Sequence, residues 1–145
     1  ENGVKFKWYF IGDGPERQKI EHGIKTNERL NHMVLLGLQT NPYKYMEQAD
    51  VYVQTSKFEG FGMTIAEAKI LGKPIVSTNF DVVYNQITHE KNGLISEMSG
   101  KSVADNIYRM ITDNELRNSI IEEVNREVNT THLTEAKKVE GLIDK

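Results

Sequence analysis

Residues 49–78 read ADVYVQTSKFEGFGMTIAEAKILGKPIVST. Two short apolar runs in this stretch, 50–54 and 74–77, have the β-branched and aromatic composition of buried strands. Between them, a glycine-containing run over 55–62 predicts a loop, and a mostly apolar run over 63–71 predicts a helix. Consecutive parallel strands need a crossover of this kind, so the stretch predicts one strand–helix–strand unit of an α/β sheet.

The flanking sequence continues the same alternation, without an internal repeat or a linker. Further strands are expected at 5–11, 33–38 and 94–95. Further helices are expected at 15–29, 42–48, 83–89, 101–112, 114–128 and 134–143. Right-handed crossovers place helices on both faces of such a sheet. The sequence therefore predicts a single Rossmann-like domain over residues 1–145, a doubly wound parallel sheet in a three-layer α/β/α sandwich.

The composition limits the classes of function. Hydrophobic residues make up 38% and charged residues 27% of the chain, a globular balance, and a net charge of -3 gives no electrostatic case for nucleic acid or an anionic membrane as main partner. Cysteine is absent, which excludes disulfides and thiolate metal sites. No apolar run approaches a membrane-spanning length, and the N-terminus lacks an initiator Met and a signal pattern. We expect an excerpt of a longer cytoplasmic protein, peripheral to the membrane at most.

The loop before the central helix has the features of an anion site. Gly60 and Gly62 bracket Phe61, so the backbone can turn sharply and approach a ligand closely. A helix that begins near Met63 leaves unpaired N–H groups and the positive end of its dipole at this loop. A diphosphate is favoured there, although a glycine-rich loop at a helix start is weakly specific by itself.

Two glutamates sharpen this interpretation. Glu67 lies one turn into the helix among mostly apolar neighbours, and a partly buried carboxylate needs hydrogen-bond donors. The vicinal hydroxyls of a ribose would serve, while backbone N–H groups or Lys69 are the alternative. Glu59 projects from the loop, where it would orient a sugar hydroxyl or stabilise positive charge on a sugar ring; the alternative is a solvated loop side chain.

The histidines give no sign of a metal site. Their spacing does not match metal-ligand patterns, and no serine–histidine pair suited to nucleophilic catalysis is evident. The four residues are His22, His32, His89 and His132. The sequence therefore predicts no metal ion.

At the glycine loop the chain resembles the family 4 retaining glycosyltransferases of the GT-B architecture. The family's signature is a pair of glutamates with seven residues between them, and Glu59 and Glu67 match it. The surrounding EGFGMTIAEAKILGKPIVST is close to the family pattern, and ADVYVQTS and YFIGDGPER match at their expected places. The resemblance runs from about Lys5 to the C-terminus, and capsule and surface-polysaccharide transferases are the most similar type.

The resemblance implies a role for each matching position. Glu59 would be the catalytic residue beside the donor sugar, and Glu67 would bind the ribose hydroxyls. Leu38 and Gln39 would contact the nucleobase, and Gly12 would let the first loop approach the ligand. The diphosphate would be held at Gly60, Phe61, Gly62, Met63 and Thr64.

The implied reaction is transfer of a sugar, a hexosyl group, from a nucleotide diphosphate donor to an acceptor hydroxyl with retained anomeric configuration. No cofactor and no metal are implied, because basic side chains and a helix end neutralise the leaving diphosphate. The glycan or lipid-linked acceptor would bind a missing N-terminal domain. The family's phosphate-binding Arg and Lys would lie upstream of Glu1, so the fragment alone would be inactive.

A second departure from the family lies at residues 79–84, where NFDVVY stands in place of a glycine pair and would bring bulkier side chains to the donor-sugar end. Two other functions stay open: a nucleotide-sugar epimerase of the GT-B fold, and a non-catalytic Rossmann-like interaction module. Fold alone does not separate them from a transferase. The paired glutamates Glu59 and Glu67 argue against both.

Overall fold

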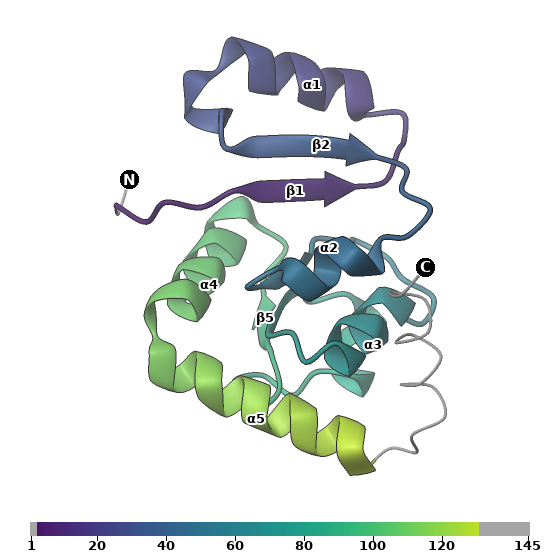
Figure 1. The fold of residues 1–145 in the computed structure, drawn as a ribbon, viewed down its shortest axis with the longest axis vertical. Coiled ribbons are helices and arrows are strands. Elements are labelled where there is room, and N and C mark those ends of the chain that lie inside the picture. The colour runs from purple at the N-terminus through teal and green to yellow at the C-terminus, as the bar shows by residue number, and fades with distance from the viewer. Residues whose placement is uncertain (1–2, 131–145) are drawn as a thin grey trace. The chain divides into compact units, whose positions relative to one another are not determined.

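The computed structural model describes residues 3–130, so the helix predicted at 134–143 lies outside the described residues. The chain divides into two compact units, Glu1–Pro42 and Tyr43–Lys145. Each unit contains its own parallel sheet (Figure 1).

The first unit is a strand–helix–strand unit. Its elements are β1 (Trp8–Ile11), α1 (Arg17–Thr26), the 3-10 helix η1 (Glu28–Leu30) and β2 (Met33–Gly37). The two strands pair in parallel, and α1 is the crossover between them. The predicted strands and helix are confirmed, although α1 begins two residues after the predicted start, because the turn closed by the Arg17 N–H on the Gly14 carbonyl (3.0 Å) comes first.

The second unit is a three-stranded parallel sheet with helices around it. Its elements are α2 (Tyr43–Gln48), β3 (Tyr52–Gln54), α3 (Met63–Ile70), β4 (Ile75–Thr78), the 3-10 helix η2 (Asp81–Asn85), β5 (Leu94–Ser96), α4 (Gly100–Thr112) and α5 (Asn114–Thr130). The strand order is β3–β4–β5, and both pairings are parallel. The central strand-helix-strand unit predicted from residues 49–78 is thus confirmed.

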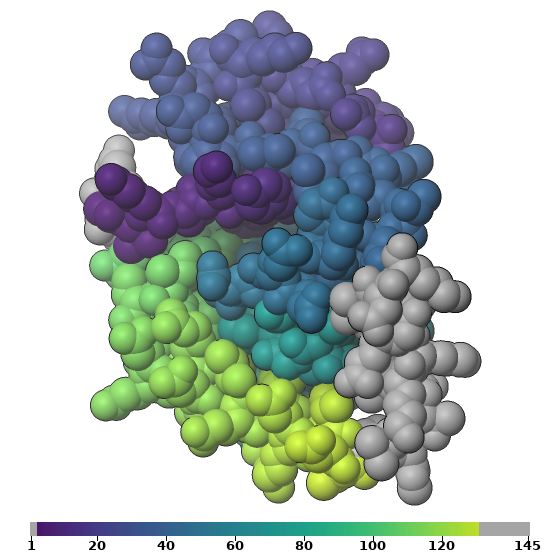
Figure 2. All heavy atoms as spheres, viewed as in Figure 1, coloured from purple at the N-terminus to yellow at the C-terminus, as the bar shows by residue number. Residues whose placement is uncertain are grey.

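Helices cover both faces of this sheet. Successive residues of a strand point to opposite faces. Ile75 of β4 packs with buried side chains of α2, α3 and η2, whereas the next residue, Val76, packs with those of β5, α4 and α5. The predicted α/β/α layering is therefore confirmed in the second unit. On one face of this unit, α4 and α5 lie against each other and form a continuous surface (Figure 2).

Two details differ from the sequence-based prediction. Within residues 3–130 the strands form two hydrogen-bonded sheets, β1–β2 and β3–β4–β5, not one continuous ladder. The predicted helix at 83–89 is replaced by the short η2, because a local turn takes over at Thr88, whose N–H donates to Asn92 Oδ1 (2.7 Å) and whose carbonyl accepts the Asn92 N–H (3.2 Å). None of the helices in the described part of the chain is long and apolar enough to cross a membrane.

Candidate functional site

The loop from β3 to α3 turns into the helix at a glycine with left-handed backbone. Gly62 has φ 74° and ψ 43°, a conformation that other residues rarely adopt, and no side chain caps the helix. Its carbonyl accepts the Ile65 N–H (3.0 Å). The N–H groups of Gly62, Met63 and Thr64 donate to no acceptor among residues 3–130. Open N–H groups therefore lie at the predicted start of the helix, and the binding of an anion there stays a prediction.

Glu59 is held by a hydrogen-bond network through one carboxylate oxygen. Its Oε1 accepts from Gln54 Nε2 (2.7 Å) and from Ser56 Oγ (2.6 Å). Gln54 Oε1 in turn accepts from Tyr52 Oη (2.5 Å) and Thr64 Oγ1 (3.1 Å). Burial raises the pKa of Tyr52, so its hydroxyl remains a donor at neutral pH. Glu59 is half-buried and fixed, which makes the alternative of a freely solvated side chain wrong.

The same loop is tied to the carboxyl end of the central strand. Thr78, the last residue of β4, is buried, and its hydroxyl donates to the carbonyl of Ser56 (2.6 Å) and more weakly to that of Gln54 (3.4 Å). The Glu59 network therefore lies at the carboxyl edge of the parallel sheet. This edge is where ligands bind in open α/β folds.

Glu67 is paired with a tyrosine from α2. Its Oε1 accepts from Tyr43 Oη (3.0 Å), and burial together with this hydrogen bond raises the pKa of Tyr43, which keeps the hydroxyl protonated. The alternative partner suggested by the sequence, Lys69, pairs instead with Glu127 (2.9 Å). The second carboxylate oxygen of Glu67 accepts no hydrogen bond within residues 3–130.

The other predicted site residues lie partly in the glycine loop and partly in the first unit. Phe61 and Met63 expose 65% and 59% of their surface, so the loop is open to solvent. In the first unit, Gly12 has φ 130°, Leu38 is exposed, and Gln39 Nε2 donates to the Leu36 carbonyl (2.7 Å). Contact of Gly12, Leu38 and Gln39 with a nucleotide stays a prediction.

The segment that departs from the family does not crowd the loop as the sequence suggested. Phe80 and Val83 are 1% and 0% exposed and belong to the buried cluster beneath α3. That expectation is therefore wrong for these two side chains, because the 3-10 turn directs them into the core. Tyr84 alone among the bulky residues of this turn is largely exposed.

Sequence reasoning missed several polar partners of the loop. They are Tyr43, Gln54, Ser56 and Gln86. The sequence does contain a signal for Gln54 and Ser56 as site residues, because polar residues at the carboxyl end of a buried strand lie at the edge of the sheet where ligands bind. No local sequence pattern identifies Tyr43 as the partner of Glu67 or Gln86 as the partner of the glycine turn, because both come from other parts of the chain.

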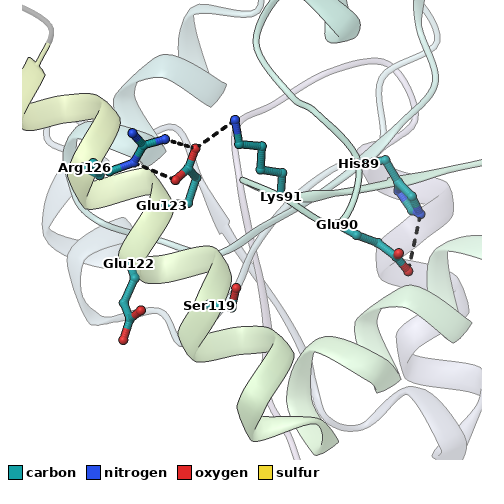
Figure 3. Close-up of a pocket in the computed structure, with 7 residues that line it drawn as sticks. All are labelled: His89, Glu90, Lys91, Ser119, Glu122, Glu123 and Arg126. Atoms are coloured by element: carbon teal, nitrogen blue, oxygen red, sulfur yellow. Dashed lines mark hydrogen bonds and ion pairs between the residues drawn. The ribbon is translucent and has the colours of Figure 1, made fainter.

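A separate open hollow of about 460 Å³ is lined by the segment before β5 and by α5 (Figure 3). Its lining residues are His89, Glu90, Lys91, Ser119, Glu122, Glu123 and Arg126. The segment 89–91 precedes β5, so the hollow adjoins the amino end of that strand, not the carboxyl edge. Its charges pair with one another: Glu123 lies 2.6 Å from Arg126 and 3.2 Å from Lys91. We therefore do not consider it the functional site.

The paired Glu123 predicts an acid-sensitive contribution to stability. The Arg126 hydrogen bonds, with Lys91, lower the pKa of Glu123 from 4.5 to about 2. Because the folded-state pKa is the lower one, the stabilisation is complete above about pH 4.5 and is lost as the pH falls toward 2. Glu123→Gln is expected to flatten the decline of the unfolding free energy between these pH values, measured by urea titration. Glu122→Gln is the control, and an equal flattening in both variants would contradict the assignment.

The described residues contain no group of three or more His, Cys, Asp or Glu side chains that could hold a metal ion.

A parallel α/β sandwich with a glycine turn and open N–H groups at its carboxyl edge is typical of Rossmann-like domains. A family model, glycosyl transferases group 1, matches residues 1–127. The chain therefore belongs to this glycosyltransferase family, as the resemblance of its motifs predicted.

Individual relatives agree with this membership. Over 120 residues the chain is 33% identical to a poly(ribitol-phosphate) alpha-N-acetylglucosaminyltransferase of Staphylococcus aureus, covering 80% of the chain and 24% of that protein. The structure of the S. aureus TarM G117R mutant with fondaparinux, alpha-GlcNAc-glycerol and UDP is 25% identical with a TM-score of 0.78, covering 96% of this chain and 29% of that one. Anabaena HepE with UDP-glucose shares the fold at 20% identity and a TM-score of 0.79, covering 95% and 40%. The chain thus spans about a quarter of the length of the staphylococcal relative.

Proposed function

We propose that this chain binds the nucleoside diphosphate sugar of a retaining glycosyltransferase, which transfers the sugar to an acceptor hydroxyl. One arrangement carries the proposal: open N–H groups at the start of α3 are flanked in the chain by two carboxylates, Glu59 and Glu67, each fixed through a single oxygen. Open N–H groups at a helix start suit a diphosphate, and a fixed carboxylate with a free oxygen suits sugar hydroxyls.

In this proposal each group has one task. The N–H groups of Met63 and Thr64, with the turn at Gly62, bind the diphosphate, and the α3 dipole stabilises its charge as it leaves without a metal ion. Glu67 accepts from the ribose hydroxyls through its free oxygen. Glu59 binds the donor sugar near the reacting carbon. The positions proposed to face the nucleobase end are Gly12, Leu38 and Gln39.

The complete activity is proposed for a longer protein in which a further domain binds the acceptor, since the staphylococcal relative is about four times as long as its match to this chain. That relative is named for transfer of N-acetylglucosamine to poly(ribitol phosphate), which supports a surface polymer as the acceptor class. TarM was crystallised with UDP, which supports UDP as the nucleotide of the donor.

A titration of the isotope-labelled chain with UDP, GDP and ADP tests donor binding directly. Saturable amide NMR shifts at residues 60–67 with UDP, and weaker ones with the other nucleotides, are the expected result. Shifts that spread evenly over the chain, or none at 60–67 with any of the three nucleotides at several millimolar, would contradict the proposal and favour a non-catalytic module.

Glu67→Ala is expected to weaken UDP binding about 5- to 150-fold, since loss of hydrogen bonds to a charged group removes about 1–3 kcal/mol. Calorimetric or NMR dissociation constants measure the effect. Glu47→Ala is the matched control, because Glu47 is an exposed helical glutamate of α2. An unchanged affinity in Glu67→Ala would remove Glu67 from the ribose-binding role.

A further inference from the structure

Gln86 lies against the glycine turn from a distant part of the second unit. Its side-chain Nε2 donates to the carbonyl of Gly62 (3.0 Å) and to that of Phe61. The contact is close: a side chain added at Gly62 would place its Cβ 2.9 Å from this nitrogen. The turn therefore favours glycine for its backbone angles, and a side chain added there would also displace the Gln86 amide.

These two hydrogen bonds, together with the Ile65 N–H that donates to the Gly62 carbonyl (3.0 Å), hold the peptide units that carry the neighbouring N–H groups. A trans peptide unit is planar, and its N–H points opposite to its carbonyl. The Phe61 carbonyl shares its peptide unit with the Gly62 N–H, and the Gly62 carbonyl shares its unit with the Met63 N–H. Gln86 contacts both carbonyls from one side, so both N–H groups point away from its amide, where they have no acceptor among the described residues.

The backbone of Gln86 is itself fixed by a partly buried charged network. Its carbonyl accepts from Lys69 Nζ of α3 and from Asn92 Nδ2 (3.3 Å). Glu127 of α5 accepts from the same two groups, Lys69 Nζ (2.9 Å) and Asn92 Nδ2 (2.7 Å). Asn92 is 3% exposed, and its Oδ1 accepts the Thr88 N–H (2.7 Å). Two helices, α3 and α5, and the buried turn at Asn92 thus hold the backbone of Gln86 in place.

We propose that Gln86 is a positioning residue for the donor diphosphate. It orients the N–H groups of Gly62 and Met63 as a pair of donors aimed at one anion, and the Lys69–Glu127–Asn92 network keeps it in that position. Successive backbone N–H groups in such a turn form an anion-binding concavity. This inference rests on the proposed nucleotide-sugar function and adds to it a residue that does not contact the ligand.

The test replaces the amide and follows individual N–H groups. In the unsubstituted chain, saturating UDP is expected to move the Gly62 and Met63 amide protons downfield. Gln86→Met keeps the length of the side chain but removes its donors. It is expected to weaken UDP binding about 5- to 20-fold and to abolish the downfield shifts of Gly62 and Met63 while the UDP-induced shift at Glu67 persists. Loss of a purely structural residue would change the UDP-induced shifts of Gly62, Met63 and Glu67 together, not those of Gly62 and Met63 alone.

Two further variants complete the design. Gln86→Glu keeps the shape but loses the donors and is expected to weaken UDP binding at least as much, since a carboxylate repels the diphosphate. Gln48→Met changes an exposed glutamine whose amide donates to the Lys44 carbonyl of its own helix (2.9 Å), and the affinity should stay within about twofold of the original.

The outcomes separate this inference from the proposed function. Unchanged affinity and unchanged Gly62 and Met63 shifts in Gln86→Met would overturn the positioning role and leave the function standing. Loss of the folded amide spectrum in both Gln86 variants would also overturn it, because Gln86 would then be a structural residue. Absence of UDP, GDP and ADP binding in the unsubstituted chain would overturn both proposals.

Discussion

Replacing Glu59 with glutamine is expected to lower kcat of the complete enzyme about 100- to 1,000-fold, the range found when one preorganised charge-stabilising group is removed from an active site. The carboxylate is already oriented, because Gln54 and Ser56 both donate to its Oε1. The other oxygen accepts nothing within residues 3–130 and is free to meet a sugar that gains positive charge. Glutamine keeps the shape and removes the charge, so the loss should fall on turnover.

The affinity for UDP should change little, by about threefold at most, because UDP carries no sugar for Glu59 to contact. Steady-state kinetics for kcat, with a separate UDP dissociation constant, distinguish the two effects. Ser56→Ala removes one of the two donors that orient Glu59 and should give a smaller loss of turnover. Normal turnover in Glu59→Gln would exclude Glu59 from catalysis, as would an equal loss in Glu47→Gln, an exposed glutamate of α2.

The part of the site that the sequence predicts is the part made by one continuous segment. Glycines followed by an apolar helix determine the turn at Gly62 and the helix start at Met63, because both follow from local backbone preferences and helix geometry. The position of Glu67 one turn into the helix follows from the same geometry. Local sequence therefore predicts where the donors and the two carboxylates lie along the chain.

The partners of these groups could not be predicted, because they come from distant positions. Tyr43 is 24 residues from Glu67, and Lys69 is 58 residues from Glu127. Spacing along a chain carries no information on such pairs, which only the packing of α2, α3 and α5 brings together. The same holds for the side chain of Phe80, which local sequence placed at the ligand end and packing placed in the core.

Ile65 belongs to the buried core and also donates a backbone hydrogen bond to the glycine turn. Ile65→Ala is expected to lower the free energy of unfolding by about 2–5 kcal/mol. The side chain is 0% exposed and belongs to the cluster that includes Ile75 and Phe80, so its removal leaves a cavity beneath α3. Urea unfolding should show a lower midpoint with an unchanged slope. Met63→Ala, in the same helix but 59% exposed, is the control and should change stability by about 0.5 kcal/mol or less. Equal losses in both variants would show that α3 is not held by this core.

The same variant separates global stability from loop geometry. The Ile65 N–H donates to the Gly62 carbonyl (3.0 Å), so a shift of this residue into the cavity would reach the glycine turn directly. If Ile65→Ala retains more than about 1.4 kcal/mol of stability, over nine-tenths of the chains stay folded, and loss of folded protein changes the apparent UDP affinity very little. A several-fold weaker UDP affinity under those conditions would therefore come from the turn itself. An unchanged affinity would mean that the hydrogen bonds from Gln86 keep the turn in place without the support of Ile65.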